Sequence, residues 1–207
     1  SNLDTQDGTN CLRILFGDWN DSINGLGQTK DEGRQFGTGV SVMASLHLYQ
    51  NLSEMAQILK KIGGYEDTVC RYGKIRETLK NGILKTAVDT NAQGKMRIVH
   101  GWGDHGSYKI GSFCDSDGAS RISFAPYAFW ATSDLIEETP QFKNLLIENI
   151  LALRSKYGLL TLTPAFSPSS PGVGKIAGIP KGTAENECVY VHAAMFSVLA
   201  LFRLGRA

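Results

Sequence analysis

The stretch VSVMASLHLYQNLSEMAQILKKI, residues 40–62, carries the clearest structural signal in the sequence, and Gly63-Gly64 follows it directly. Its apolar residues recur every three or four positions, at Val40, Met43, Ala44, Leu48, Leu52, Met55 and Leu59. That spacing places them on one face of an α-helix. Glycine commonly ends helices because it accepts backbone conformations that other residues avoid. The stretch therefore predicts a long amphipathic helix that ends at the glycine pair.

Four further segments have helical patterning, residues 65–87, 126–138, 141–157 and 186–204. The last of these is apolar on nearly all sides, which is typical of a helix inside a protein. Long loops separate the helices at residues 89–119, with room for about two short strands, and at residues 161–183. We predict an all-α fold over one domain, residues 1–207. In a helical toroid of paired inner and outer helices, the long loops would meet at one end around a central pocket.

The charge balance excludes several kinds of partner. Twenty-one Lys and Arg residues oppose twenty Asp and Glu residues, so the net charge of +1 attracts neither nucleic acid nor anionic lipid. No apolar run approaches the roughly 20 residues of a membrane helix, and the first residues do not resemble a signal peptide. We expect a cytoplasmic protein that acts on a small polar ligand.

Metal sites are not expected either. The four cysteines are far apart and form no CxxC pair, which argues against a zinc site and a disulfide scaffold. The segment Asp115-Ser116-Asp117-Gly118 is similar to part of a calcium-binding loop, but the other ligands of such a loop are missing. We therefore assign no metal to this sequence.

The first motif that carries chemistry is Gly17-Asp18-Trp19-Asn20-Asp21. An indole offers a flat face to the apolar side of a pyranose ring, and Asp and Asn side chains hydrogen-bond sugar hydroxyls. A protonated carboxyl group donates its proton to a departing glycosidic oxygen. The motif therefore indicates a sugar site, although the same residues also suit an ordinary Asx turn beside a half-buried tryptophan.

The second motif, Gly182-Thr183-Ala184-Glu185-Asn186-Glu187-Cys188-Val189-Tyr190-Val191-His192, places polar residues at the start of an apolar segment. If this segment is helical, spacings of four and three residues bring Glu185 and His192 to one face over two turns. Such a pair suits a ligand site at the mouth of a helix. A histidine on an apolar face equally suits a structural role in the core.

Taken together and in order, these motifs resemble glycoside hydrolase family 94, which contains cellobiose, chitobiose and related disaccharide phosphorylases. The landmarks that carry the resemblance are Gly17-Asp18-Trp19-Asn20-Asp21-Ser22-Ile23-Asn24, Pro164-Ala165-Phe166, Glu185-Asn186 and His192-Ala193-Ala194. Their order and spacing extend over nearly the whole chain, so the set is far more specific than any single motif.

The resemblance implies an (α/α)6 barrel and inverting phosphorolysis of a β-linked disaccharide or oligosaccharide to a sugar 1-phosphate. Inorganic phosphate is then the co-substrate, and no other cofactor is needed. In the matching motif the carboxylate after Trp-Asn is the general acid, which is Asp21 here. His192 matches a phosphate-binding histidine. The substrate-binding positions are then Trp19, Asn20, Glu185 and Asn186.

Such a barrel needs more helices than this chain supplies. We therefore expect the chain to be the C-terminal half of a catalytic barrel, with the remainder of its own chain or a second copy as partner. The sequence also departs from the family pattern, which usually reads Glu-Asn-Gly where this chain has Glu185-Asn186-Glu187. A carboxylate close to phosphate is repulsive, so Glu187 weakens the phosphorylase interpretation.

Two alternatives remain open on the sequence alone. An inverting hydrolase would use Asp21 as acid and Glu185 or Glu187 as base to water, with carboxyl groups separated by roughly 6.5–9.5 Å. A helical protein that binds carbohydrate without catalysis is the other. The sequence does not distinguish the sugar or the linkage.

Overall fold

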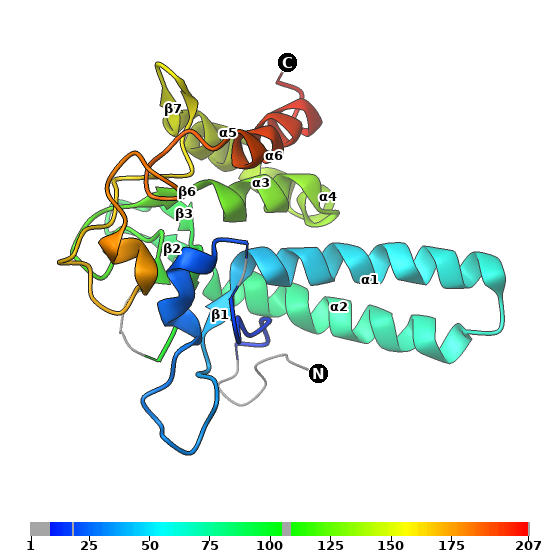
Figure 1. Ribbon diagram of the computed structural model, residues 1–207. Coiled ribbons are helices and arrows are strands. Elements are labelled where there is room, and N and C mark those ends of the chain that lie inside the picture. Colours follow the sequence, from blue (N-terminus) through cyan, green and yellow to red (C-terminus); the bar gives the residue numbers. More distant parts are fainter. Residues whose placement is uncertain (1–8, 18, 105–108, 207) are drawn as a thin grey trace.

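The computed structural model describes residues 9–17, 19–104 and 109–206. Its longest elements are helices α1 (Val42–Ile62) and α2 (Glu66–Thr86), which form an antiparallel hairpin that projects from the rest of the molecule (Figure 1). The Ser41 side chain caps α1 by accepting a hydrogen bond from the Ala44 N–H, and Gly63 ends it with a φ of 80°. The predicted helices over residues 40–62 and 65–87 are confirmed to within two residues.

Helix α3 (Phe124–Thr132) lies at the centre of the remaining helices, and every residue from Phe124 to Ala131 is buried. It contacts α1, α5 (Lys143–Ala152) and α6 (Val191–Arg203). The short helix α4 (Leu135–Glu138) follows it, and one-turn or two-turn 3-10 helices occur at η1 (Asp21–Gly27), η2 (Pro140–Phe142) and η3 (Lys175–Gly178). A helix that is apolar on all sides is stable only when neighbours cover each side, which is the position that α3 occupies.

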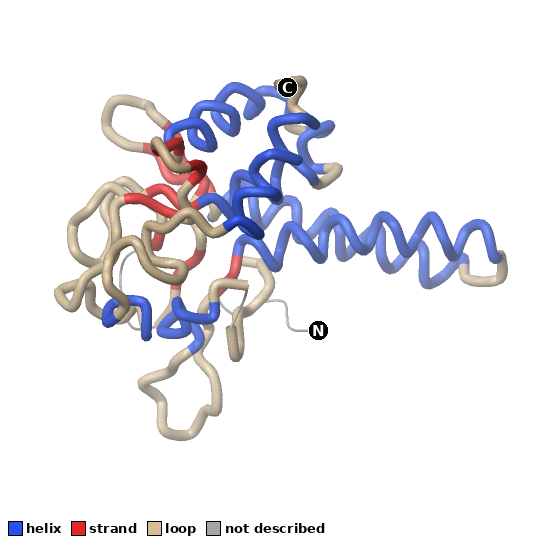
Figure 2. Tube along the Cα trace, turned by 45° about the horizontal axis from the view of Figure 1, so that its top comes forward, coloured by secondary structure: helices blue, strands red, loops and turns tan. Residues whose placement is uncertain are grey.

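The strands are short and all of their pairings are antiparallel. They form one three-stranded ladder in the order β1-β4-β5 and three pairs, β2-β3, β6-β9 and β7-β8. Their bounds are β1 (Val40–Ser41), β2 (Val88–Thr90), β3 (Met96–Ile98), β4 (Gly101–Trp102), β5 (Lys109–Ile110), β6 (Ile122–Ser123), β7 (Arg154–Ser155), β8 (Gly158–Leu159) and β9 (Leu162–Thr163). In Figure 2 the strands lie among the loops, at the end of the molecule opposite the turn of the α1–α2 hairpin.

The fold is thus mainly helical, as predicted, but the strands make "all-α" correct only in part. The predicted helix over residues 126–138 is broken at Ser133, whose hydroxyl donates to the Trp130 carbonyl at 3.0 Å and competes with the next helical turn. The helix predicted over 141–157 ends at Ala152, because residues 154–159 form the β7-β8 hairpin.

The predicted helix over residues 186–204 begins only at Val191. We expected it to be buried on all sides, and this was wrong for the described part of the chain. Its buried face, with Ala193, Ala200 and Leu204, lies against the core. The opposite face exposes four apolar side chains at intervals of three or four residues, which are Val191, Met195, Leu199 and Phe202.

A small second core lies beneath the loops and is separate from the main helical core. It consists of Ile14, Ile23, Leu26, Ile110, Leu162, Phe166, Val173 and Ile176. This cluster packs η1 against η3, although about 150 residues separate them in the sequence. None of the helices in the described ranges is long and apolar enough to cross a membrane.

Candidate active site

Asp21 is the first residue of η1, and its side chain is exposed. Within the described ranges its carboxyl group makes no hydrogen bond or ion pair. It faces a cavity of about 480 Å³ lined by Leu15, Phe16, Gly17, Asp21, Asn24, Gly27, Gln28, Gln35, Phe36 and Lys175. The cavity therefore combines one free carboxyl group with three side-chain amides, one ammonium group and two aromatic rings.

Close backbone contact between η1 and η3 brings Lys175 to the Asp21 cavity. The Asn24 side-chain oxygen accepts a hydrogen bond from the Lys175 N–H at 3.0 Å, and the Gly25 N–H donates to the Val173 carbonyl at 3.3 Å. A side chain at position 25 would place its Cβ 2.6 Å from the Gly174 nitrogen. Glycine is thus required at position 25 for the two 3-10 helices to approach this closely.

Trp19 and His192 lie against each other, although they are 173 residues apart in the sequence. The indole Nε1–H of Trp19 donates to Nδ1 of His192 at 3.2 Å. The Trp19 ring also contacts Phe124 edge-on at 5.1 Å and Tyr190 at 5.7 Å between ring centroids. The His192 ring packs on Phe196 at 4.9 Å. Helix α6 and the loop before η1 therefore meet through a cluster of aromatic rings at the start of α6.

Asn20 lies between these two groups and is buried, with 4% of its surface exposed. Its side-chain oxygen accepts a hydrogen bond from the Ser22 hydroxyl at 2.5 Å, and its carbonyl accepts one from the Ile23 N–H at 3.1 Å. These bonds are typical of a residue that starts a helical turn. Asn20 thereby sets the direction in which η1 leaves the Trp19 loop.

The segment from Glu185 to Tyr190 is not helical, so the prediction that Glu185 and His192 share a helix face is wrong. Ala184 and Glu187 have φ angles of 45° and 59°, which lie in the left-handed region and interrupt a helix. The Thr161 hydroxyl donates to the Glu185 carbonyl at 2.7 Å. The Glu185 side chain is half-buried and makes no hydrogen bond or ion pair in the described part of the structure.

Asn186 is completely buried and holds together the loop of residues 164–180. Its amide nitrogen donates to the Phe166 and Ile179 carbonyls at 2.9 and 2.7 Å, and its oxygen accepts from the Phe166 N–H at 2.8 Å. An unpaired amide at this depth would cost about 1–3 kcal/mol. Asn186 therefore organises backbone, and no part of its side chain reaches the surface.

The Glu187 carboxylate is held by three donors. It accepts hydrogen bonds from the Thr163 hydroxyl at 2.9 Å and the Ala165 N–H at 2.7 Å, and it pairs with Lys181 at 3.2 Å. Its φ of 59° lies in the left-handed region, which glycine adopts more readily than glutamate. The expected repulsion between Glu187 and a bound phosphate is thus reduced, because Lys181 balances the negative charge.

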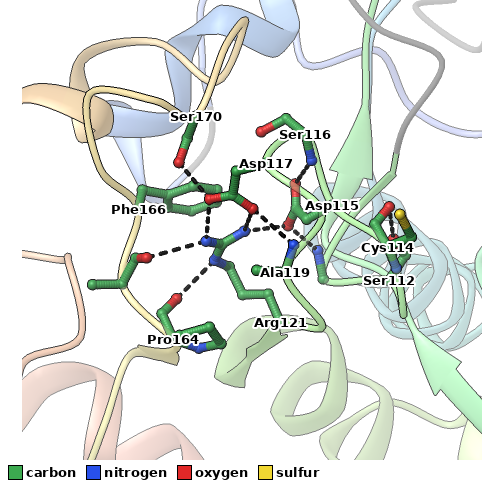
Figure 3. Close-up of polar contacts among 12 residues, drawn as sticks. Ser112, Cys114, Asp115, Ser116, Asp117, Ala119, Arg121, Pro164, Phe166 and Ser170 are labelled. Atoms are coloured by element: carbon green, nitrogen blue, oxygen red, sulfur yellow. Dashed lines mark hydrogen bonds and ion pairs between the residues drawn. The ribbon is translucent and has the colours of Figure 1, made fainter.

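A buried arginine that the sequence analysis did not identify anchors the same loop from the other side (Figure 3). Arg121 is 0% exposed, and its guanidinium pairs with Asp115 and Asp117 at 2.9 Å each. It also donates to the Pro164 carbonyl at 2.7 Å and lies 3.7 Å from the centroid of the Phe166 ring. The segment that is similar to a calcium loop is therefore an arginine-binding turn.

Burial of Asp117 raises its pKa, but the bonds from Arg121, Ser170 and the Ala119 N–H outweigh that effect and lower the pKa to about 2. The carboxylate is therefore ionised at neutral pH. In the described part of the chain no group of three or more His, Cys, Asp or Glu side chains is arranged to hold a metal ion.

The structure thus forms three local assemblies from the predicted residues. Asp21 faces Lys175 across the cavity, Trp19 holds His192, and Asn186 and Glu187 hold the 164–180 loop. Among the described residues, neither Trp19 nor His192 lines the Asp21 cavity. Convergence of all the predicted residues on one pocket remains a prediction.

The chain is similar over most of its length to three proteins that are named as phosphorylases. The chain is 30% identical over 191 residues to a solabiose phosphorylase of Paenibacillus borealis, covering 92% of this chain and 23% of that protein. It is 27% identical over 190 residues to a 3-O-beta-D-glucopyranosyl-beta-D-glucuronide phosphorylase of the same organism, with 92% and 22% covered. An N,N'-diacetylchitobiose phosphorylase of Vibrio proteolyticus is 24% identical over 198 residues, with 96% and 22% covered.

The chain therefore spans less than a quarter of the length of the curated relatives that it matches. The model of the glycosyl hydrolase 94 superfamily catalytic domain matches residues 3–207, which is nearly the whole chain. On that match, this chain belongs to the glycosyl hydrolase 94 superfamily and corresponds to part of its catalytic domain.

Proposed function

We propose that the protein containing this chain catalyses inverting phosphorolysis of a β-linked disaccharide or oligosaccharide. Asp21 is the general acid and inorganic phosphate is the nucleophile. The observation that carries the proposal is the exposed Asp21 carboxyl group, which has no hydrogen bond or ion pair among the described residues, at a cavity lined by amides and aromatic rings. Three relatives named as disaccharide phosphorylases support the reaction class. In this proposal the helices form part of an (α/α)6 barrel.

In the reaction, Asp21 transfers its proton to the glycosidic oxygen as the bond from that oxygen to the anomeric carbon breaks. A phosphate oxygen forms the new bond to the same carbon from the opposite face, so the β-linkage becomes an α-configured sugar 1-phosphate. The departing sugar leaves with a hydroxyl group, and Asp21 is left as a carboxylate. Phosphate takes the place that activated water has in a hydrolase.

The departing sugar is assigned to the Asp21 cavity. Gln28, Gln35 and Asn24 supply both donors and acceptors for hydroxyl groups. Phe16, which is 87% exposed, and Phe36 meet edge-on at 6.5 Å and offer an apolar surface to a pyranose ring. One exposed and one half-buried aromatic ring beside amides suit a carbohydrate site.

The other predicted residues differ in how well they suit direct contact with substrate. Glu185 has a side chain without protein partners in the described ranges and is assigned to sugar hydroxyls. Asn20 and Asn186 are buried and hydrogen-bonded, so we assign them to shaping the loops around the substrate. His192, exposed at the start of α6, is assigned to phosphate.

A hydrolase is the second candidate, and the contacts of the two glutamates favour Glu185 over Glu187 as its base. Glu187 is disfavoured, because its carboxylate oxygens are already occupied by a hydroxyl, a backbone N–H and an ammonium group. The Glu185 side chain has no such partners among the described residues.

Steady-state kinetics on the complete polypeptide, with and without phosphate, test the proposal. Asp21→Asn keeps the size of the side chain but removes the transferable proton, so turnover should fall by about 10²- to 10⁴-fold. Asp31→Asn is the matched control, since Asp31 is an exposed carboxylate that pairs with Arg34 and accepts a hydrogen bond from the Gly33 N–H. Near-normal turnover in Asp21→Asn eliminates it as the acid. Full cleavage without phosphate shows a hydrolase, and no cleavage under either condition shows a non-catalytic protein.

A further inference from the structure

The hydrogen bond between Trp19 and His192 determines which nitrogen of His192 carries the proton. The indole Nε1–H is a donor and has no acceptor capacity. It points at Nδ1 of His192 at 3.2 Å, so Nδ1 must offer its lone pair. In a neutral imidazole the proton then lies on Nε2. His192 therefore presents an N–H donor on the side of its ring that faces away from Trp19.

The surrounding rings fix the position of this pair. Trp19 is half-buried and is contacted edge-on by Phe124 of α3, while Tyr190 packs against it from the segment before α6. Phe196, one turn further along α6, packs on the His192 ring at 4.9 Å. A rotation of the imidazole that moves Nδ1 away from Trp19 would break the bond to the indole. His192 itself remains exposed, and among the described residues its Nε2 makes no hydrogen bond.

We propose that Trp19 is a positioning residue, and that it fixes the tautomer and ring orientation of His192 so that the Nε2–H donates to the attacking phosphate. This inference rests on the proposed function, in which His192 contacts phosphate. Phosphate oxygens accept hydrogen bonds, so an imidazole that presented a lone pair would repel the nucleophile. This positioning role differs from the sugar-stacking role that we expected for Trp19, because neighbouring rings already contact its indole.

A kinetic test separates the two roles of Trp19. Trp19→Phe keeps an aromatic ring and removes the N–H, so the KM for phosphate should rise by about 2- to 10-fold, the range set by one hydrogen bond. The KM for the sugar should stay within about twofold of its original value. Tyr190→Phe is the matched control, because it changes the same aromatic cluster and leaves the Trp19–His192 bond intact.

A double variant makes the test specific to the imidazole. The amide of His192→Gln presents an N–H donor in a similar position but has no tautomers. In that background Trp19→Phe should not raise the KM for phosphate further. An equal rise in both backgrounds, or a rise in the KM for the sugar alone, would overturn the inference.

A chemical test does not depend on activity. Diethyl pyrocarbonate acylates an imidazole nitrogen that has a free lone pair, and the Trp19 indole covers that lone pair in His192. Peptide mass spectrometry of the complete polypeptide should show several-fold faster acylation of His192 in Trp19→Phe, with unchanged rates in Tyr190→Phe and at His47 as internal reference. Equal rates at His192 would refute the hydrogen-bond assignment. A protein that passes this test but needs no phosphate would refute the proposed function and the phosphate contact, and would leave only the orientation of His192 by Trp19.

Discussion

Replacement of Arg121 by methionine should loosen the loop of residues 161–170 far more than its position outside the cavity suggests. The substitution leaves the completely buried Asp115 carboxyl group without its cation and the Pro164 carbonyl without its donor. Removal of one partner from a buried ion pair typically costs about 3–5 kcal/mol. The cation–π contact with Phe166, at 3.7 Å, is lost as well. Methionine has a similar length, so the loss arises from charge and hydrogen bonding.

Hydrogen exchange measured on peptides of the complete polypeptide gives a local readout of this loss. The Ala165 and Phe166 amides, which are bonded to Glu187 and Asn186, report on opening of the loop. A local destabilisation of 3–5 kcal/mol should accelerate their exchange by about 10²- to 10⁴-fold, since each 1.36 kcal/mol is a factor of ten.

Arg34→Met is the matched control, because the Arg34–Asp31 pair is 51% and 57% exposed. Exposed pairs contribute about 0–1 kcal/mol, so exchange in residues 161–170 should not change measurably in this variant. If Arg121→Met accelerated exchange by less than about tenfold, or no more than Arg34→Met, the argument that the buried arginine holds this loop would be wrong.

Three further predictions concern stability and the cavity. Because the folded pKa of Asp117 is about 2 against an ordinary 3.8, its contribution of about 2 kcal/mol is complete above pH 5 and is lost as the pH falls from 4 to 2. The difference in melting temperature between the parent protein and Asp117→Asn should therefore be clear at pH 6 and nearly vanish at pH 2. Gly25→Ala should reduce phosphorolysis strongly, since its Cβ would meet the backbone of Val173 and Gly174. Gly73→Ala, in an exposed part of α2 with no atom within 4 Å, should instead stabilise the protein by about 0.5–1 kcal/mol, measured by thermal melting.

The long helices were predictable because their signals are local. Apolar spacing and the glycine pair at 63–64 are sufficient to predict α1, and the same periodicity is sufficient to predict α2. The start of α6 was not predictable in this way. The residues before Val191 form hydrogen bonds to residues 161–166, and these tertiary bonds outweigh the helical pattern of the sequence.

In the candidate site too, local signals were predictable from the sequence and long-range contacts were not. The residue types at Asp21, Trp19 and His192 indicated sugar chemistry, and the resemblance supplied their roles. Arg121 gave no signal, because a single arginine in a polar segment is ordinary in sequence. Its importance depends on carbonyl groups 43 and 44 residues away that only the folded chain brings to it.

The sequence separation of 173 residues between Trp19 and His192 has a consequence for biosynthesis. Closing a loop of that length costs on the order of 4–5 kcal/mol of chain entropy, while one hydrogen bond returns about 1 kcal/mol. The pair therefore forms only after α6 has docked on α3 through Ala193, Ala200 and Leu204. During translation the α1–α2 hairpin emerges before α6, and its contacts do not depend on α6 because they are local. A nascent chain that stalls before residue 191 would contain that hairpin, but the Trp19 indole N–H would lack His192 as its acceptor.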